Sequence, residues 1–154
     1  MTDQAVTEAL RAYVKLLRAA KAVLARVEPL LVAEGLTPTQ LGVLEAVFHK
    51  GPLTQRELGR KVLTSAGNMT DVMDKLERRG LVRRARSAVD RRAVRVELTP
   101  EGRDLIQLLF PRHARDIAAA MSALSGDELQ QLGALLKRLG LAAVAGLAEE
   151  PDAH

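Results

Sequence analysis

The chain has 154 residues, of which 47% are hydrophobic and 27% charged, with a formal net charge of +4 and no cysteine. This length and apolar content fit one domain, or two closely joined subdomains, and the lack of cysteine excludes disulfides, thiolate metal sites and cysteine-based redox sensing. The sequence contains no run of about 18 apolar residues, which is the length needed to span a membrane, and its first residues lack the layout of a signal peptide. We therefore expect a cytoplasmic protein without membrane contact.

Residues 1–35 predict one long amphipathic helix. Its apolar residues step by 4, 3, 4, 3, 4, 3 and 4, and they are Val6, Leu10, Tyr13, Leu17, Ala20, Leu24, Val27 and Leu31. A heptad-like seam of this kind needs a partner helix to cover it. Pro29 predicts that the helix kinks or ends one turn early, and Gly35 predicts its final stop.

Two short helices with complete start signals follow. Thr37 and Gln40 have the spacing of a capping box, and Thr54 and Glu57 repeat it. The pair Gly51-Pro52 separates the two helices. The expected helices cover residues 38–49 and 55–61.

A third helix and a two-stranded ribbon complete the centre of the chain. The helix begins at Thr64 or Ser65 and stops at Gly80, because its apolar residues recur at spacings of three and four. These residues are Ala66, Met69, Val72, Met73 and Leu76. After Gly80 the period drops to two, which predicts strands beginning at Leu81 and covering 94–98, joined by 87–92. Helix, turn, helix and hairpin in this order predict a winged helix-turn-helix.

Two further amphipathic helices are expected at the C-terminal side. Thr99 and Pro100 open the first, in which Pro111 predicts a kink, and Ser125 with Glu128 forms a third capping box that opens the second. Together the terminal helices hold more apolar surface than the central module can cover. We therefore expect a two-fold homodimer through these helices.

Positive charge is concentrated in the third helix and the ribbon. Between Lys75 and Arg95 nine basic residues stand against two acidic ones, so this segment carries +7 and the rest of the chain −3. A basic helix beside a basic hairpin is the electrostatic footprint of a protein that binds a phosphate backbone. Aromatic residues make up only 2%, which argues against stacking on single strands and favours a duplex.

The hairpin and its exit carry a gap-free motif. Asp90 and Arg92, followed after five residues by Leu98, Thr99 and Gly102, resemble the Asp-x-Arg and Leu-Thr-x-x-Gly pattern of the MarR family of bacterial transcriptional regulators. The similarity extends over residues 53–58, 65–70 and 75–82. It implies a dimeric winged helix-turn-helix protein that binds pseudopalindromic operator DNA, usually as a repressor. The resemblance also implies that small anionic, often aromatic, ligands release the protein from DNA.

The expected fold is mainly α with a small β-hairpin wing. It is a winged helix-turn-helix module bracketed by long N- and C-terminal dimerisation helices. Residues 1–35 form the N-terminal dimerisation helix, 36–99 the DNA-binding module and 100–154 the C-terminal dimerisation helices.

The resemblance places Ser65, Gly67 and Asn68 at the groove-facing N-terminal end of the recognition helix. There side chains reach base edges and a glycine allows close approach. Ordinary capping and first-turn preferences would explain the same residue types. Lys75 is expected to contact a phosphate.

Asp71 and Asp74 on the same helix would be repelled by a duplex. They either accept from a cytosine amino group or pair within the chain, for example with Lys75 or Arg78 at i+4, and we favour pairing.

Arg91 and Arg92 occupy the expected tip of the wing, where a guanidinium can enter a narrow minor groove. In the family pattern Asp90 instead stabilises the wing and its arginine. A solvated charged turn is the alternative. Thr54 and Gln55, at a helix N-terminus, could bind a phosphate through amide hydrogens, although capping alone explains them equally well.

No residue set indicates a metal, a cofactor or catalysis. The three histidines lack partners at metal-ligand spacing, and no nucleophile triad or phosphate-cradling glycine loop is present, so an enzyme is the weakest hypothesis. The alternative to a DNA-binding regulator is a winged-helix module that binds an acidic protein partner. An effector cavity would lie between the module and the long helices, and its candidate lining residues are Tyr13, Phe48, His49, Phe110, Arg112 and His113. The alternative is that these are ordinary core and surface residues.

Overall fold

The computed structural model describes residues 2–62 and 66–148 and divides the chain into two compact units, one up to Ala118 and one from Ala119 on. Helices dominate both units, as predicted. In chain order the elements are α1 (Asp3–Ala33), α2 (Pro38–Lys50), β1 (Leu53–Thr54), α3 (Gln55–Lys61), α4 (Ala66–Arg78), β2 (Val82–Arg86), β3 (Val94–Leu98), α5 (Pro100–Ala120) and α6 (Gly126–Ala148). None of these helices is long and apolar enough to cross a membrane.

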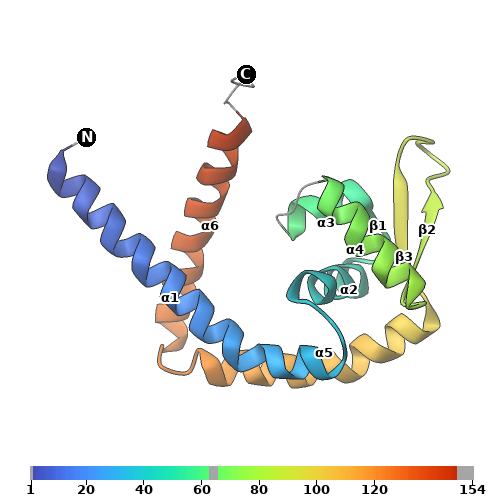
Figure 1. Ribbon diagram of the computed structural model, residues 1–154, viewed down its shortest axis with the longest axis horizontal. Coiled ribbons are helices and arrows are strands. Elements are labelled where there is room, and N and C mark those ends of the chain that lie inside the picture. The colour runs from blue at the N-terminus through green and yellow to red at the C-terminus, as the bar shows by residue number, and fades with distance from the viewer. Residues whose placement is uncertain (1, 63–65, 149–154) are drawn as a thin grey trace. The chain divides into compact units, whose positions relative to one another are not determined.

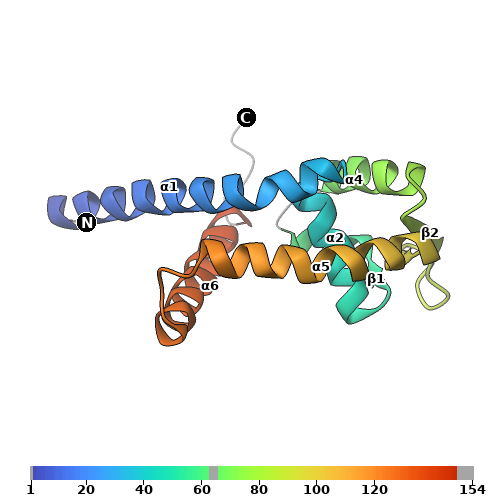
Figure 2. The ribbon, with the colours of Figure 1, turned by 90° about the horizontal axis from the view of Figure 1, so that it is seen from below.

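The sheet has three antiparallel strands in the order β1-β3-β2. The hairpin of β2 and β3 was predicted, and its register pairs Val82 with Leu98 and Arg86 with Val94. The two-residue strand β1, which pairs Leu53 with Val96, was not predicted. The chain passes directly from β3 into α5, so the hairpin stands at the N-terminal end of α5. Helix α5 then runs below α2 in the view of Figure 1. Seen from below, α5 passes in front of α2 (Figure 2).

Helix α4 has the predicted apolar stripe. Met69, Met73 and Leu76 are fully buried in the core of the first unit, while Gly67 and Lys75 on other faces are exposed. The helix ends before Gly80, which has φ +70°, and the Leu81 N–H donates to the Leu76 carbonyl at 3.0 Å, a bond typical of a glycine-terminated helix. The predicted cap at Thr64 or Ser65 lies outside the described residues.

Helix α1 continues past Pro29 to Ala33, so the predicted early end is wrong. The last turn stays helical because Val27 and Leu31 are buried, which stabilises it although proline cannot supply one of the backbone hydrogen bonds. Gly35 terminates the helix as predicted. It has φ +65°, and the Leu36 N–H donates to the Leu31 carbonyl at 2.9 Å. Pro111 likewise lies inside α5.

All three predicted capping boxes are formed. At α3, the Thr54 hydroxyl accepts from the Glu57 N–H at 3.1 Å and the Glu57 carboxylate accepts from the Thr54 N–H at 2.8 Å. The same reciprocal pair joins Thr37 to Gln40 and Ser125 to Glu128. The hydrogen bond from the Thr54 backbone lowers the pKa of Glu57.

The terminal helices expose apolar side chains. On α1, Leu10 is 59% and Tyr13 57% exposed, and on α6, Leu139 is 54% exposed. The remaining members of these two sets are Val6, Val14, Leu17, Leu24 and Val32 on α1 and Leu135, Leu136, Leu141 and Val144 on α6. Each helix therefore presents an apolar surface larger than scattered single residues would give.

The junction between β3 and α5 gives the Leu-Thr-x-x-Gly motif a physical reason. The Thr99 hydroxyl donates to the Gly80 carbonyl and accepts from the Gly102 N–H at 3.0 Å, so it both caps α5 and ties it to the end of α4. A Cβ at Gly102 would lie 1.9 Å from the Leu81 carbonyl oxygen. Only glycine allows α5 to pass so close to the chain at Leu81.

Replacing Gly102 by Ala should therefore destabilise the protein by about 2 kcal/mol or more, because backbone must move to admit the methyl group. Urea unfolding followed by circular dichroism measures the change. Gly67→Ala is the matched control, since no atom of the described residues lies within 4 Å of a Cβ there, and helix propensity predicts a gain of about 0.5–1 kcal/mol. Equal stability of the Gly102 variant and the wild type would contradict the close approach.

Candidate nucleic-acid interface

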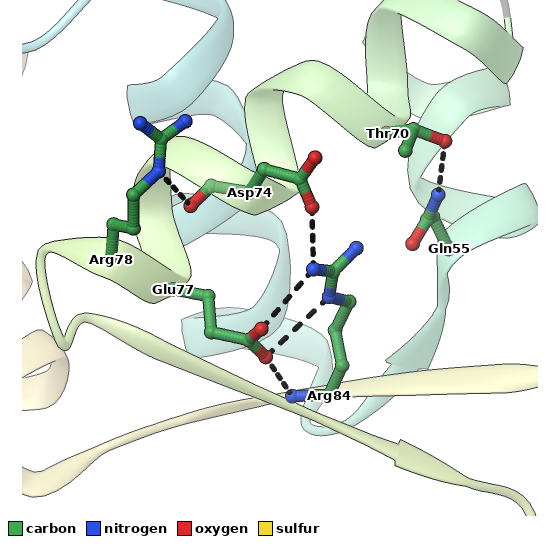
Figure 3. Close-up of polar contacts among 6 residues, drawn as sticks. All are labelled: Gln55, Thr70, Asp74, Glu77, Arg78 and Arg84. Atoms are coloured by element: carbon green, nitrogen blue, oxygen red, sulfur yellow. Dashed lines mark hydrogen bonds and ion pairs between the residues drawn. The ribbon is translucent and has the colours of Figure 1, made fainter.

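Arg84 on β2 fastens the wing to helix α4 (Figure 3). Its guanidinium donates to Asp74, and to both Glu77 oxygens at 3.1 and 3.4 Å. The Arg84 backbone N–H also donates to Glu77 at 3.1 Å. These hydrogen bonds lower the pKa of Glu77 and raise that of Arg84, so both groups stay charged at neutral pH.

The two aspartates of α4 pair within the chain. Asp71 pairs with Lys75 at 2.9 Å, as the i+4 spacing predicts. The predicted partner Arg78 is wrong for the Asp74 carboxylate, which pairs with Arg84 because β2 lies beside α4. Arg78 instead donates to the Asp74 backbone carbonyl at 3.4 Å. Each of these two aspartates therefore has a cationic partner within the protein, which weakens its repulsion of a duplex.

Helices α3 and α4 are joined by Gln55. Its side-chain amide donates to the Thr70 hydroxyl at 3.2 Å (Figure 3), and Thr54 caps α3. Gln55 thus braces the two helices against each other, a role that the sequence did not indicate. Gly67 is exposed in the first turn of α4 with open space around it, and Asn68 beside it is exposed and has a polar partner. Ser65 lies outside the described residues.

The loop at the end of the wing is held by its own side chains. The Asp90 carboxylate accepts from the Arg92 backbone N–H at 2.9 Å, and the Ser87 hydroxyl accepts from the Val89 N–H at 3.3 Å. The Ala93 N–H donates to the Asp90 carbonyl at 3.0 Å. Asp90 thus forms a turn of the Asx type that orders the backbone of the tip.

The nine basic residues of the 75–95 segment fall into two groups. Six are engaged in hydrogen bonds or ion pairs, namely Lys75, Arg78, Arg79, Arg83, Arg84 and Arg95. Arg86, Arg91 and Arg92 are exposed, and their side chains make no hydrogen bond or ion pair with any residue in 2–62 and 66–148. The uncommitted charge is therefore concentrated at the end of the wing.

A second polar cluster lies where α2 meets α5. His113 is buried, and its Nε2 lies 3.9 Å from the Oε1 of Glu45. Neither this oxygen nor the His113 Nδ1 has a hydrogen-bond partner among the described residues. Burial raises the pKa of Glu45, partly offset by His113 and His49. Beside them His49 stacks edge-on between Phe48 and Phe110, with ring centroids 5.1 and 4.7 Å apart.

Four of the six candidate effector residues thus gather in this cluster, although His49 is itself exposed. Tyr13 and Arg112 are exposed and have no contact with the cluster among the described interactions. Sequence reasoning missed Glu45, because its helical spacing resembles that of any surface carboxylate. Among the described residues, no group of three His, Asp or Glu side chains could hold a metal ion.

A short helix, a second helix with an exposed N-terminal turn and a hairpin with a cationic tip define a winged helix-turn-helix protein. Residues 36–94 match the MarR family model. The chain is also 35% identical over 134 residues to the HTH-type transcriptional regulator MhqR of Bacillus subtilis (strain 168), covering 87% of this chain and 92% of MhqR. The chain belongs to the MarR family of DNA-binding transcriptional regulators.

Solved structures share the fold. NadR in complex with 4-hydroxyphenylacetate is 25% identical, with a TM-score of 0.72 and coverage of 82% of this chain and 89% of NadR. A mutant MarR from E. coli complexed with operator DNA is 23% identical, with a TM-score of 0.76 and coverage of 86% and 95%. At 23% identity the second likeness establishes the fold.

Replacing Arg84 by Gln should loosen the wing, because Asp74 and Glu77 then face each other as like charges without their shared cation. Amide hydrogen exchange of β2 should speed up roughly tenfold. Arg83→Gln is the matched control. Among the described residues Arg83 pairs only with Glu97, across the hairpin at 3.0 Å, and it is largely exposed, so its replacement should change exchange little. Equal effects of the two variants would show that Arg84 does not hold the wing.

Replacing Glu45 by Gln should stabilise the protein at neutral pH. A carboxyl whose pKa is raised in the folded state supports folding most below its ordinary pKa of 4.5, and this contribution disappears as the pH rises through the folded value. At about pH 7 the variant should melt roughly 2 °C higher than the wild type, and the gain should vanish near pH 4. Glu28→Gln, at an exposed site on α1, is the control. A gain that grows on acidification would contradict this interpretation.

Proposed function

We propose that this regulator is a ligand-responsive repressor that binds a pseudopalindromic operator as a homodimer. The observation that carries the proposal is the division of the basic residues. Six contact other residues of the protein, and Arg86, Arg91 and Arg92 are exposed without a partner among the described residues. Charge left unpaired at an ordered hairpin tip supports a phosphate or minor-groove contact.

Helix α4 is the proposed reader of bases. Its apolar stripe is turned into the core, so its exposed first turn, with Ser65, Gly67 and Asn68, would enter the major groove. Gly67 allows the backbone to come close to the duplex. Thr54 and Gln55 would present the N-terminal amides of α3 to a phosphate. Lys75, whose ion pair with Asp71 is exposed to solvent, would contact another phosphate further along α4.

The wing would reach the adjacent minor groove. Arg91 and Arg92 are its proposed contacts, and Asp90 holds the backbone that carries them. A narrow minor groove has an enhanced negative potential, which attracts guanidinium groups without base-specific hydrogen bonds.

The homodimer is proposed to form through the terminal helices. The exposed leucines of α1 and α6 support this, because a stable monomer rarely leaves such faces uncovered. A two-fold axis would then present two copies of α4 to successive major grooves, about 34 Å apart.

The proposed effector is a small anionic or phenolic acid. Membership of the family and the 4-hydroxyphenylacetate bound in the NadR structure support this class. In this chain, the cluster of Glu45, Phe48, His49, Phe110 and His113 offers aromatic rings and unpartnered polar atoms beside each other. Occupation of this region would alter the packing of α2 against α5.

The test uses Arg91→Ala and Arg92→Ala with an operator that the wild type selects from random duplexes. Each variant should bind more weakly, and the slope of log affinity against log salt concentration should fall by about 0.9 for each phosphate that the variant no longer neutralises. Fluorescence anisotropy across a range of salt concentrations measures both quantities. Arg115→Ala, an exposed arginine on α5, is the matched control and should leave the slope unchanged.

Two further measurements complete this experiment. Sedimentation equilibrium should give two chains per particle, and added 4-hydroxyphenylacetate or another phenolic acid should release the operator. If neither arginine variant changes DNA affinity, while binding to an acidic protein is abolished, the chain is a protein-interaction module instead. A wild type that selects no duplex sequence would remove the operator from the proposal.

A further inference from the structure

Arg79 connects the end of the recognition helix to the end of α1. It follows directly after α4, and its guanidinium donates to the Gly35 carbonyl at 2.7 Å and to the Glu34 carbonyl at 2.9 Å. These acceptors lie 44 and 45 residues earlier in the chain. Counted by charge alone, Arg79 belongs to the basic segment, but its guanidinium faces α1.

The end of α1 needs such a cation. A helix C-terminus carries a partial negative charge and carbonyls without partners inside the helix. The last turn of α1 contains no basic residue of its own. The planar fork of a guanidinium can serve two neighbouring carbonyls at once, which a lysine ammonium does with less directional control. Arg79 therefore supplies from α4 the C-terminal charge that α1 lacks.

The same end of α4 is fixed on its other side. The Leu81 N–H donates to the Leu76 carbonyl at 3.0 Å, and the Thr99 hydroxyl donates to the Gly80 carbonyl. Leu31 of α1 and Leu76 of α4 are both buried in one apolar core. Polar and apolar contacts thus hold the last turns of α1 and α4 in one arrangement.

We propose that Arg79 is a positioning residue that sets the separation of the two recognition helices in the dimer and does not contact phosphate. The inference rests on the proposed function, because α1 must take part in the dimer and α4 must read the operator. A rigid link between the ends of these helices makes the half-site spacing a property of the protein. Without the link, each α4 can tilt relative to its own α1.

The experiment measures binding to duplexes of different half-site spacing. The operator that the wild type selects is compared with versions in which the half-sites are one base pair closer or farther apart. Arg79→Ala should bind the original operator roughly threefold to tenfold more weakly. It should also discriminate less between the three spacings, while the salt slope stays at the wild-type value because the same number of phosphates is neutralised.

Two variants frame this result. Arg78→Ala is the matched control. The one hydrogen bond of the Arg78 guanidinium to a described residue goes to the Asp74 carbonyl of its own helix, at 3.4 Å, so the spacing preference of this variant should remain that of the wild type. Arg79→Lys keeps the charge without the fork and should restore part of the preference. Circular dichroism and sedimentation equilibrium show whether each variant folds and dimerises. If the Ala variant does not fold, the Lys variant alone decides.

The possible outcomes distinguish a failure of the proposed role of Arg79 from a failure of the proposed dimeric operator binding. A salt slope lower by about 0.9 with an unchanged spacing preference would make Arg79 a phosphate contact and overturn the proposal. A spacing preference equal to that of the wild type in a folded, dimeric Lys variant would overturn it as well. If the wild type itself binds all spacings equally, or is a monomer, the dimeric operator reader fails and the coupling through Arg79 fails with it.

Discussion

Burial of one stripe of α4 is the constraint on which the interface depends. Met69, Met73 and Leu76 are enclosed by the core of the module, and this fixes the rotation of the helix about its axis. Each such side chain stabilises the fold by about 1.5–3 kcal/mol when fully buried. A rotated helix would expose methionines and bury carboxylates. The first turn and the exposed face are therefore presented outward as a consequence of packing, before any polar contact is considered.

Ion pairs then determine the charge of the α4 surface that packing leaves exposed. A helix with Asp71, Asp74 and Glu77 on its outer half would repel a phosphate backbone, because like charges at short range oppose approach. Lys75 pairs with Asp71, and Arg84 pairs with both Asp74 and Glu77, so two of the three negative charges are offset within the protein. Arg84 does more than cancel charge, since it also fixes β2 against α4. The cations that stay unpaired, at the end of the wing, are thus held at a defined place relative to the recognition helix.

Much of the fold follows from local sequence signals, because the responsible contacts span only a few residues. The boxes at Thr37, Thr54 and Ser125 join atoms three residues apart, and the stops at Gly35 and Gly80 need only a left-handed backbone. Contacts between distant segments were not predictable in this way. The two-residue strand β1 has no period of its own and exists only because β3 lies beside it.

The site shows the same division. The hairpin arginines and the turn at Asp90 could be predicted from a local motif, whereas the partners of Asp74, Arg79 and Glu45 lie 10, 44 and more residues away. Composition counts Arg79 and Arg84 with the DNA-facing cations, although geometry commits both to the protein. The sequence gives the number of basic residues in a segment. The fold determines which of them are paired within the protein and which are available to a partner.

The turn between α4 and β2 is the point where the remaining elements meet. Arg79 fixes it to the end of α1, Thr99 fixes it to the start of α5, and Gly102 lets α5 pass against Leu81 without a clash. Helix α5 also carries His113, which faces Glu45 on α2, and both side chains have a polar atom without a hydrogen-bond partner in the described part of the chain. A ligand that binds these atoms acts on the helix whose first turn anchors α4 and the wing. Because packed elements switch between discrete arrangements more readily than they deform, a small change where α2 meets α5 can shift the recognition helix as a unit.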